Sequence, residues 1–219
     1  MITFEDIKAN DNIKTYLKSG NAVLAAMGYT EHSFAHAERV AQKAAQILEK
    51  LGYEERLSEL AKIAGYMHDI GNVINRQDHA QSSAIISFQL LSNMGMSAGE
   101  VSVIASAIGN HDEGSGHAVN PVSAALILAD KSDVRRSRVR NRDVQNYDIH
   151  DRVNYAATES DLIIDKANKK IILKLSIDCE ICPLMDYFEI FMGRMLMSRR
   201  AADYLNMKFE LEINNTKFL

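Results

Sequence analysis

The sequence lacks several features that would assign a protein to a class at once. It has two cysteines among 219 residues, and its acidic start, with Glu5 and Asp6, contains no apolar signal segment. These absences predict an unexported protein in a reducing, cytoplasmic location. The longest apolar runs, such as Ala124 to Ala129, are far too short to cross a bilayer, so we expect no membrane association.

Strong charge and internal repetition are missing as well. The net charge is −4 at pH 7, which does not favour bulk electrostatic binding of nucleic acid by the chain as a whole. The composition is that of an ordinary globular protein, with 47% hydrophobic and 25% charged residues, and it predicts a packed core. The length suits one domain, or one domain with a small appendage.

The segment from Tyr66 to Asn72 is the most informative stretch. It places His68 and Asp69 side by side at the end of a predicted helix, and the chain then turns at Gly71. An imidazole and a carboxylate are costly to bury unless something pairs with them, and a first-row metal ion is a natural partner. The alternative is a helix end at which His68 meets the helix dipole and Asp69 caps the next segment.

Apolar residues at helical spacing, together with capping residues, predict helices on both sides of this stretch. The expected helices are a short one after Thr3, a lead-in with Ile13, Leu17, Leu24 and Met27 on its apolar stripe, then Ser33 to Leu51, Glu54 to His68, His79 to Gly95, one from Ser97 past Ile108, and one from Asn120 to Asp130.

Five consecutive helices each bring a possible metal ligand to the end or the apolar face of the core. Taken singly, each such residue has an ordinary explanation, such as a core histidine bonded to a backbone carbonyl. Together, four imidazoles and two carboxylates suit one or two transition-metal ions, with Asp69 able to bridge them. The expected metal ligands are His36, His68, Asp69, His79, His111 and Asp130.

The order of these residues resembles that of the HD-domain superfamily of metal-dependent phosphohydrolases. The family's H…HD…D pattern falls here on His36, His68 with Asp69, and Asp130, within a resemblance that covers residues 33–140. The segments 67–71 and 127–131 are similar to the HD domain of bacterial ribonuclease Y and to other HD phosphodiesterases. His79 and His111 resemble the extra histidines of members that hold a dinuclear centre.

This resemblance implies a mainly α protein built on an HD-domain helical bundle. It implies hydrolysis of a phosphate ester or phosphodiester, a nucleotide in the first place. The cofactors would be one or two divalent transition-metal ions, iron or manganese first, with zinc, nickel or magnesium as alternatives. These ions would act as Lewis acids and activate a water, with Asp69 as the bridging and catalytic ligand. One ion would be held by His36, His68, Asp69 and Asp130, and the other by Asp69, His79 and His111.

Two positions depart from the family's pattern. Many relatives have a lysine where this chain has Asn72, so we expect phosphate recognition to come from elsewhere. Relatives with a paired histidine at the fourth site have Asp112 here instead, which argues against a third metal and against specialised cyclic dinucleotide hydrolysis.

A basic segment follows Asp130, with Lys131 and five arginines at positions 135, 136, 138, 140 and 142. Arginine geometry suits a phosphate clamp, so Lys131, Arg135 and Arg138 are the expected substrate-binding residues for a small phosphorylated ligand. The same arginines could follow a nucleic-acid backbone, or they could form a solvated helix end.

The pattern changes after about Thr158. Apolar strands around residues 162–164 and 171–175, a helix over 183–204 and a strand over 209–213 predict a ββαβ unit. We therefore expect an HD-type helical metal-binding domain with an N-terminal helical lead-in over residues 1–157, and a small α+β appendage over 158–219. This appendage would serve homodimer formation or substrate selection. Cys179 and Cys182 are interpreted as packed free thiols, and the dyad of His150 and Asp151 as surface or the rim of a site.

Two other functions remain open at this point. HD-fold di-iron oxygenases use the same ligand types, although the basic segment favours phosphate chemistry. The second alternative is a non-catalytic binding module with a structural metal site. Structural sites tend to be closed by their ligands, so an intact HD ligand set favours catalysis.

Overall fold

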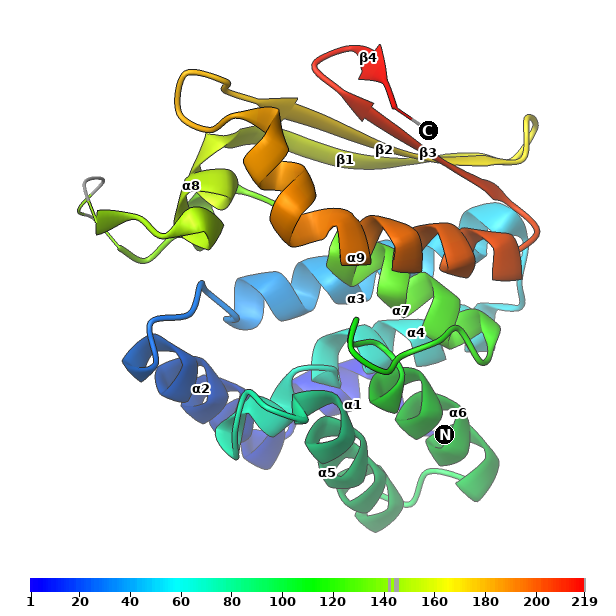
Figure 1. Ribbon diagram of the computed structural model, residues 1–219. Coiled ribbons are helices and arrows are strands. Elements are labelled where there is room, and N and C mark those ends of the chain that lie inside the picture. Colours follow the sequence, from blue (N-terminus) through cyan, green and yellow to red (C-terminus); the bar gives the residue numbers. More distant parts are fainter. Residues whose placement is uncertain (142, 144–145, 219) are drawn as a thin grey trace.

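A computed structural model describes residues 1–141, 143 and 146–218, and Arg142 of the basic segment lies outside them. The described chain is mostly helical with a small sheet near the C-terminus, as predicted (Figure 1). No described helix is both long and apolar enough to cross a membrane. The elements are α1 (Phe4–Ala9), α2 (Asp11–Ala26), α3 (Phe34–Leu51), α4 (Glu55–Met67), the 3₁₀-helix η1 (Ile70–Val73), α5 (His79–Asn93), α6 (Ala98–Gly109), α7 (Pro121–Lys131), the 3₁₀-helix η2 (Arg136–Arg138), α8 (Ile149–Ala156), β1 (Ala157–Asp165), β2 (Lys170–Ile177), α9 (Leu184–Tyr204), β3 (Lys208–Ile213) and β4 (Thr216–Lys217).

The helix ends follow the capping residues of the sequence. Thr3 and Asp6 form a reciprocal capping box at the start of α1, and the Asn120 side chain accepts the Ser123 N–H at the start of α7. The sequence pattern places Met27 on the apolar stripe of this lead-in helix, α2, and this prediction is wrong. Met27 lies just past the helix end and is half exposed, because the chain leaves the bundle there.

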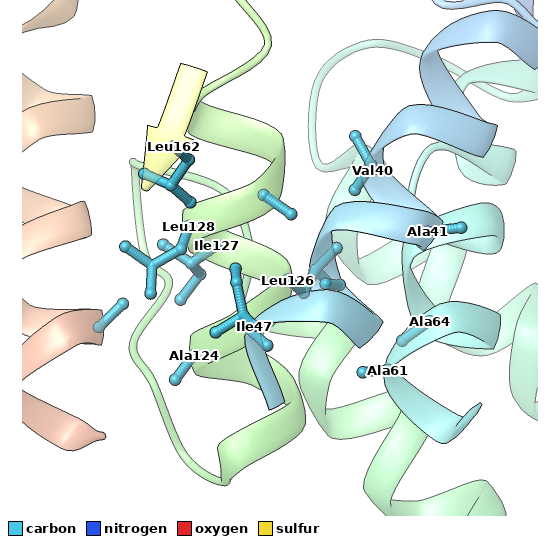
Figure 2. Close-up of a cluster of buried hydrophobic side chains, with 14 of the residues drawn as sticks. Val40, Ala41, Ile47, Ala61, Ala64, Ala124, Leu126, Ile127, Leu128 and Leu162 are labelled. Atoms are coloured by element: carbon cyan, nitrogen blue, oxygen red, sulfur yellow. The ribbon is translucent and has the colours of Figure 1, made fainter. Parts of the chain in front are cut away.

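Helices α3, α4 and α7 form the centre of the bundle. A Cβ on Gly65 would lie 2.7 Å from the Cα of Ala41, so the glycine lets α3 and α4 approach closely. Leu126 of α7 packs into this region (Figure 2). Residues 122–129 of α7 are all buried, because the bundle covers one side of this helix and α9 the other. This close packing holds the helix ends that present the polar residues described below.

The sheet has the strand order β1-β2-β3-β4. β2 and β3 are parallel and are joined through α9, whereas the other neighbours are antiparallel. The predicted ββαβ order is present, and the two-residue strand β4 extends it. α9 lies between the sheet and the bundle (Figure 1). Leu162, Leu173 and Leu211 of the sheet belong to the same hydrophobic cluster as the bundle core.

The outer face of the sheet is polar. Lys170 and Lys217 pair with Glu210, and Lys174 pairs with Glu212. The interpretation of the two cysteines as packed thiols is correct for Cys182, which is buried. It is wrong for Cys179, which is exposed because it lies in the turn that follows β2.

Candidate metal centre and adjoining pocket

Six polar side chains converge where the ends of several bundle helices meet. Each comes from a helix end: the first turn of α3 or α5, the last turn of α7, the segment just after α6, or the junction between α4 and η1. All are buried or nearly so. The structure thus brings together the residues that the sequence singles out as ligands, namely His36, His68, Asp69, His79, His111 and Asp130.

The first group forms around His36 and His68. Their Nε2 atoms are 3.3 Å apart, and the Nε2 of His36 lies 3.4 Å from Asp130 Oδ1 and 3.6 Å from Asp69 Oδ2. The Nε2 of His68 lies 3.2 Å from Asp69 Oδ2. Ligands bonded at about 2.1 Å to one ion lie roughly 3.0–3.4 Å from one another, so this spacing fits a shared metal.

The second group lies on the other side of Asp69. The Nε2 atoms of His79 and His111 are 3.2 Å apart, and the Nε2 of His79 lies 3.5 Å from Asp69 Oδ1. Ligand atoms of His68, Asp69 and His111 also fall within 4.8 Å of one another. The two oxygens of Asp69 therefore face different histidines, which is the arrangement that a bridging carboxylate requires, and His68 stands close to both groups.

The outer nitrogen of every histidine ring in the centre is already bonded. Three Nδ1 atoms lie against backbone carbonyls, which only accept, so these nitrogens carry the proton and the Nε2 lone pairs face the shared space. Lone pairs that face each other at this distance repel unless a cation lies between them. The Nδ1 partners are Asp133 Oδ2 at 2.7 Å for His36, and the carbonyls of Gly65 at 2.8 Å for His68, Arg76 at 3.1 Å for His79 and Ile108 at 2.6 Å for His111.

Asp69 provides a second sign that the residues fit a metal. Its Oδ2 is buried without a hydrogen-bond partner among the described residues, which is costly for a carboxylate unless a cation satisfies it. Its Oδ1 accepts a hydrogen bond of 2.9 Å from the side-chain amide of Asn72. Asn72, the residue that replaces the lysine of many relatives, therefore orients the Asp69 carboxylate.

The electrostatics favour the metal-binding forms of Asp69, Asp130 and His111, whereas they favour the protonated form of His68. Burial would raise the pKa of Asp69 and Asp130, but His68 in the first case and Lys131 in the second hold both values well below the usual range. Burial lowers the pKa of His111 well below its ordinary value. Burial also opposes the charge on His68, yet the Asp69 and Asp130 carboxylates outweigh it and raise that pKa to about 10. A metal that binds His68 would therefore displace a proton.

Two of the three expected substrate-binding cations, Lys131 and Arg135, form ion pairs with carboxylates around the centre. The Nζ of Lys131 lies 2.8 Å from Asp130 Oδ2 and 3.2 Å from Glu113 Oε1. The Nε of Arg135 lies 3.0 Å from Asp133 Oδ1, and its Nη2 lies 3.2 Å from a carboxylate oxygen of Glu31. Both cations neutralise carboxylates around the centre, and neither lines the pocket beside it.

A pocket of about 340 Å³ adjoins the centre between the end of α2, α8 and α9. Two lining residues connect it to the Asp69 carboxylate: the Nε2 of His32 lies 3.9 Å from Asp69 Oδ2, and Arg76 Nη1 lies 3.8 Å from Asp69 Oδ1. Arg138, the third expected cation, also lines it. A larger cavity of about 710 Å³ runs along α3. It reaches the centre only at Asp133, which contacts the Nδ1 atom of His36 and not the Nε2 side that faces the other ligands.

Sequence reasoning missed several residues of this pocket. The sequence pattern does not assign His32 to the site, because this residue precedes α3 and lies in a loop, four residues before His36. Arg76 and Arg194 show no local pattern that points to a site. The rim interpretation of the His150 and Asp151 dyad agrees with the structure, because both residues line the pocket.

Comparisons with known proteins agree with this geometry. A family model described as HD domain matches residues 33–153, which is more than half of the chain and includes all six candidate ligands. An uncharacterised protein of Methanocaldococcus jannaschii is 27% identical over 106 residues, which cover 42% of this chain and 41% of that protein. The chain thus spans about two fifths of the length of this relative. Helix α9 lies outside the matched segment.

Proposed function

Because the chain belongs to the HD domain family, whose members are generally metal-dependent hydrolases, we propose that it hydrolyses a phosphate ester or phosphodiester of a nucleotide. The observation that supports this most is the gathering of four histidine Nε2 atoms around the two oxygens of Asp69, one of which has no hydrogen-bond partner among the described residues, next to a pocket lined by arginines. The first feature fits divalent metals, and the second fits a phosphate.

The chain's own residues position these groups. Bound divalent ions would supply Lewis-acid polarisation of a phosphoryl oxygen and a more acidic water. Asp69 would bridge them, held by the amide of Asn72. Asp133 fixes the ring of His36 through its Nδ1, which keeps Nε2 free for the metal. Arg76 lies beside Asp69, where its charge would neutralise a phosphate oxygen.

The types of ligand also limit which metal ions can bind. We propose one or two ions of iron or manganese, with zinc, nickel or magnesium as alternatives, because mixed imidazole and carboxylate sets suit first-row metals. Metal analysis of the purified full chain, followed by a screen of nucleotides and phosphodiesters with manganese or iron supplied, tests the proposal. We expect release of phosphate or nucleotide that depends on the metal and is absent in Asp69→Ala.

Two outcomes of this screen would replace the proposal. Consumption of oxygen with an organic substrate and no phosphate release would indicate the di-iron oxygenase. Bound metal without turnover of any phosphorylated compound would indicate a non-catalytic binding module.

We also propose that residues 158–219 act in substrate selection. Helix α9 lines the pocket beside the centre, whereas the outer face of the sheet carries Lys–Glu pairs and offers little apolar surface for a second copy.

A further inference from the structure

Three arginines from distant parts of the chain meet in the 340 Å³ pocket. Arg76 comes from the loop before α5, Arg138 from η2 and Arg194 from α9. Each guanidinium has one carboxylate within 4 Å, and an anion bound among the three arginines would interact favourably with all of them. The pocket borders Asp69, so an anion in it would lie next to the candidate metal centre.

The three guanidinium groups differ in how the protein holds them. Arg138 is buried and donates to the carbonyls of Glu31 and Asp133, at 3.0 and 2.9 Å. The Nε of Arg194 lies 2.8 Å from Glu113 Oε1, and its guanidinium stacks on the ring of the neighbouring phenylalanine. The Nη1 atom of Arg76 is buried and has no hydrogen-bond partner among the described residues. A guanidinium held in place by backbone carbonyls and a buried donor without a hydrogen-bond partner both suit a bound oxyanion.

Two carboxylates line the α8 side of the pocket. Asp148, Asp151 and Asn154 line it from α8 and its N-terminal end. One oxygen of Asp148 already accepts the N–H of Asp151, and the carboxylate of Asp151, which also lines the pocket, can accept hydrogen bonds from hydroxyl or amino groups. The volume of about 340 Å³ lies at the small end of the range for ligand pockets, which is roughly 300–1,000 Å³.

We infer that α9 completes the substrate pocket, with Arg194, Arg76 and Arg138 binding the phosphate of a mononucleotide-sized phosphomonoester and Asp151 accepting a hydrogen bond from a hydroxyl or amino group on the body of that substrate. This inference rests on the proposed function. In the reaction, a water oxygen bonds to phosphorus and the ester P–O bond breaks. The leaving oxygen takes a proton, and the products are an alcohol and inorganic phosphate.

The test compares Arg194→Gln with Arg200→Gln, an exposed arginine farther along the same helix. Manganese-loaded protein is assayed with adenosine 5′-monophosphate and with 4-nitrophenyl phosphate, which has no hydroxyl or amino group. We expect Arg194→Gln to raise KM at least tenfold for both, with unchanged metal content, because a charge-assisted bond is lost. Arg200→Gln should behave as the wild type, and Arg194→Lys should lie between the two.

Asp151→Asn separates the two ends of the pocket. It should raise KM for adenosine 5′-monophosphate severalfold and leave 4-nitrophenyl phosphate unaffected. Calorimetry with adenosine 5′-monophosphate gives a readout that does not need turnover. If the wild type binds this probe without hydrolysing it and Arg194→Gln does not bind, the inference stands and the proposed function fails. Equal binding and equal KM in the wild type, Arg194→Gln and Arg76→Gln would overturn the inference, as would preference for a single-stranded oligonucleotide.

Discussion

The Nε2 atoms of His79 and His111 lie 3.2 Å apart, and the Nδ1–H of each ring points at a backbone carbonyl. Two neutral rings in this arrangement direct lone pairs at each other, and burial lowers the pKa of both, which opposes a shared proton. The two histidines are therefore arranged to share a metal ion and not a proton. This ion would be distinct from the one beside His36. This relationship underlies the proposal of a second ion.

Replacement of either of these two histidines tests the second ion. We expect His79→Ala and His111→Ala each to lower the occupancy of one ion, while the ion at His36 and Asp130 stays bound. The measurement is metal content per chain by mass spectrometry after dialysis. Two ions retained in both variants would reduce these residues to histidines that cap helix ends.

Asp69→Ala should remove both ions and the activity. Its Oδ2 faces His36 and His68, and its Oδ1 faces His79, so no other described carboxylate contacts both groups. The helices should remain folded by circular dichroism. Asp78→Asn serves as the control, because this aspartate is exposed and has a left-handed backbone conformation that asparagine also adopts. Wild-type metal content in Asp69→Ala would refute the bridge.

Asp133→Asn tests the support of the first ion. Asp133 accepts from Nδ1 of His36 and makes that ring a more basic ligand. Loss of its charge should weaken metal binding by about 10–100-fold without removing a ligand. Competition with a chelator measures the affinity, and Asp161→Asn on the exposed edge of β1 is the control. Equal chelator sensitivity in the two variants would show that Asp133 does not support the metal.

Glu113 makes stability depend on pH. Burial would raise the pKa of its carboxyl, but Lys131 and Arg194 lower it to about 2. A carboxyl whose pKa is lowered by folding stabilises the protein above its unfolded-state value of about 4.3, and this contribution disappears as the pH falls toward 2. Glu113→Gln should therefore lower the free energy of unfolding by about 1–3 kcal/mol at pH 7.

The difference between Glu113→Gln and the wild type should shrink as the pH is lowered from 6 to 3.5. Urea unfolding at several pH values measures it, with Glu189→Gln, an exposed change on α9, as the control. A difference that stays constant over this range would show that the ionised carboxylate does not stabilise the fold.

The sequence by itself determined the helices and the ligand types. Helical spacing and capping residues act over one or two turns, so elements such as α1 and α7 could be predicted from neighbours in the chain. The order of His36, His68, Asp69 and Asp130 is likewise a property of the chain, which is why the sequence alone carries the family resemblance.

Only the tertiary structure decided which cations face the pocket. Arg135 and Arg138 are three residues apart, yet one neutralises carboxylates around the centre and the other lines the pocket. Arg194 reaches the same pocket from a helix that follows the whole matched segment. Packing of α9 between α7 and the sheet sets these positions, and it depends on contacts between residues that are far apart in the chain, which local patterns do not encode.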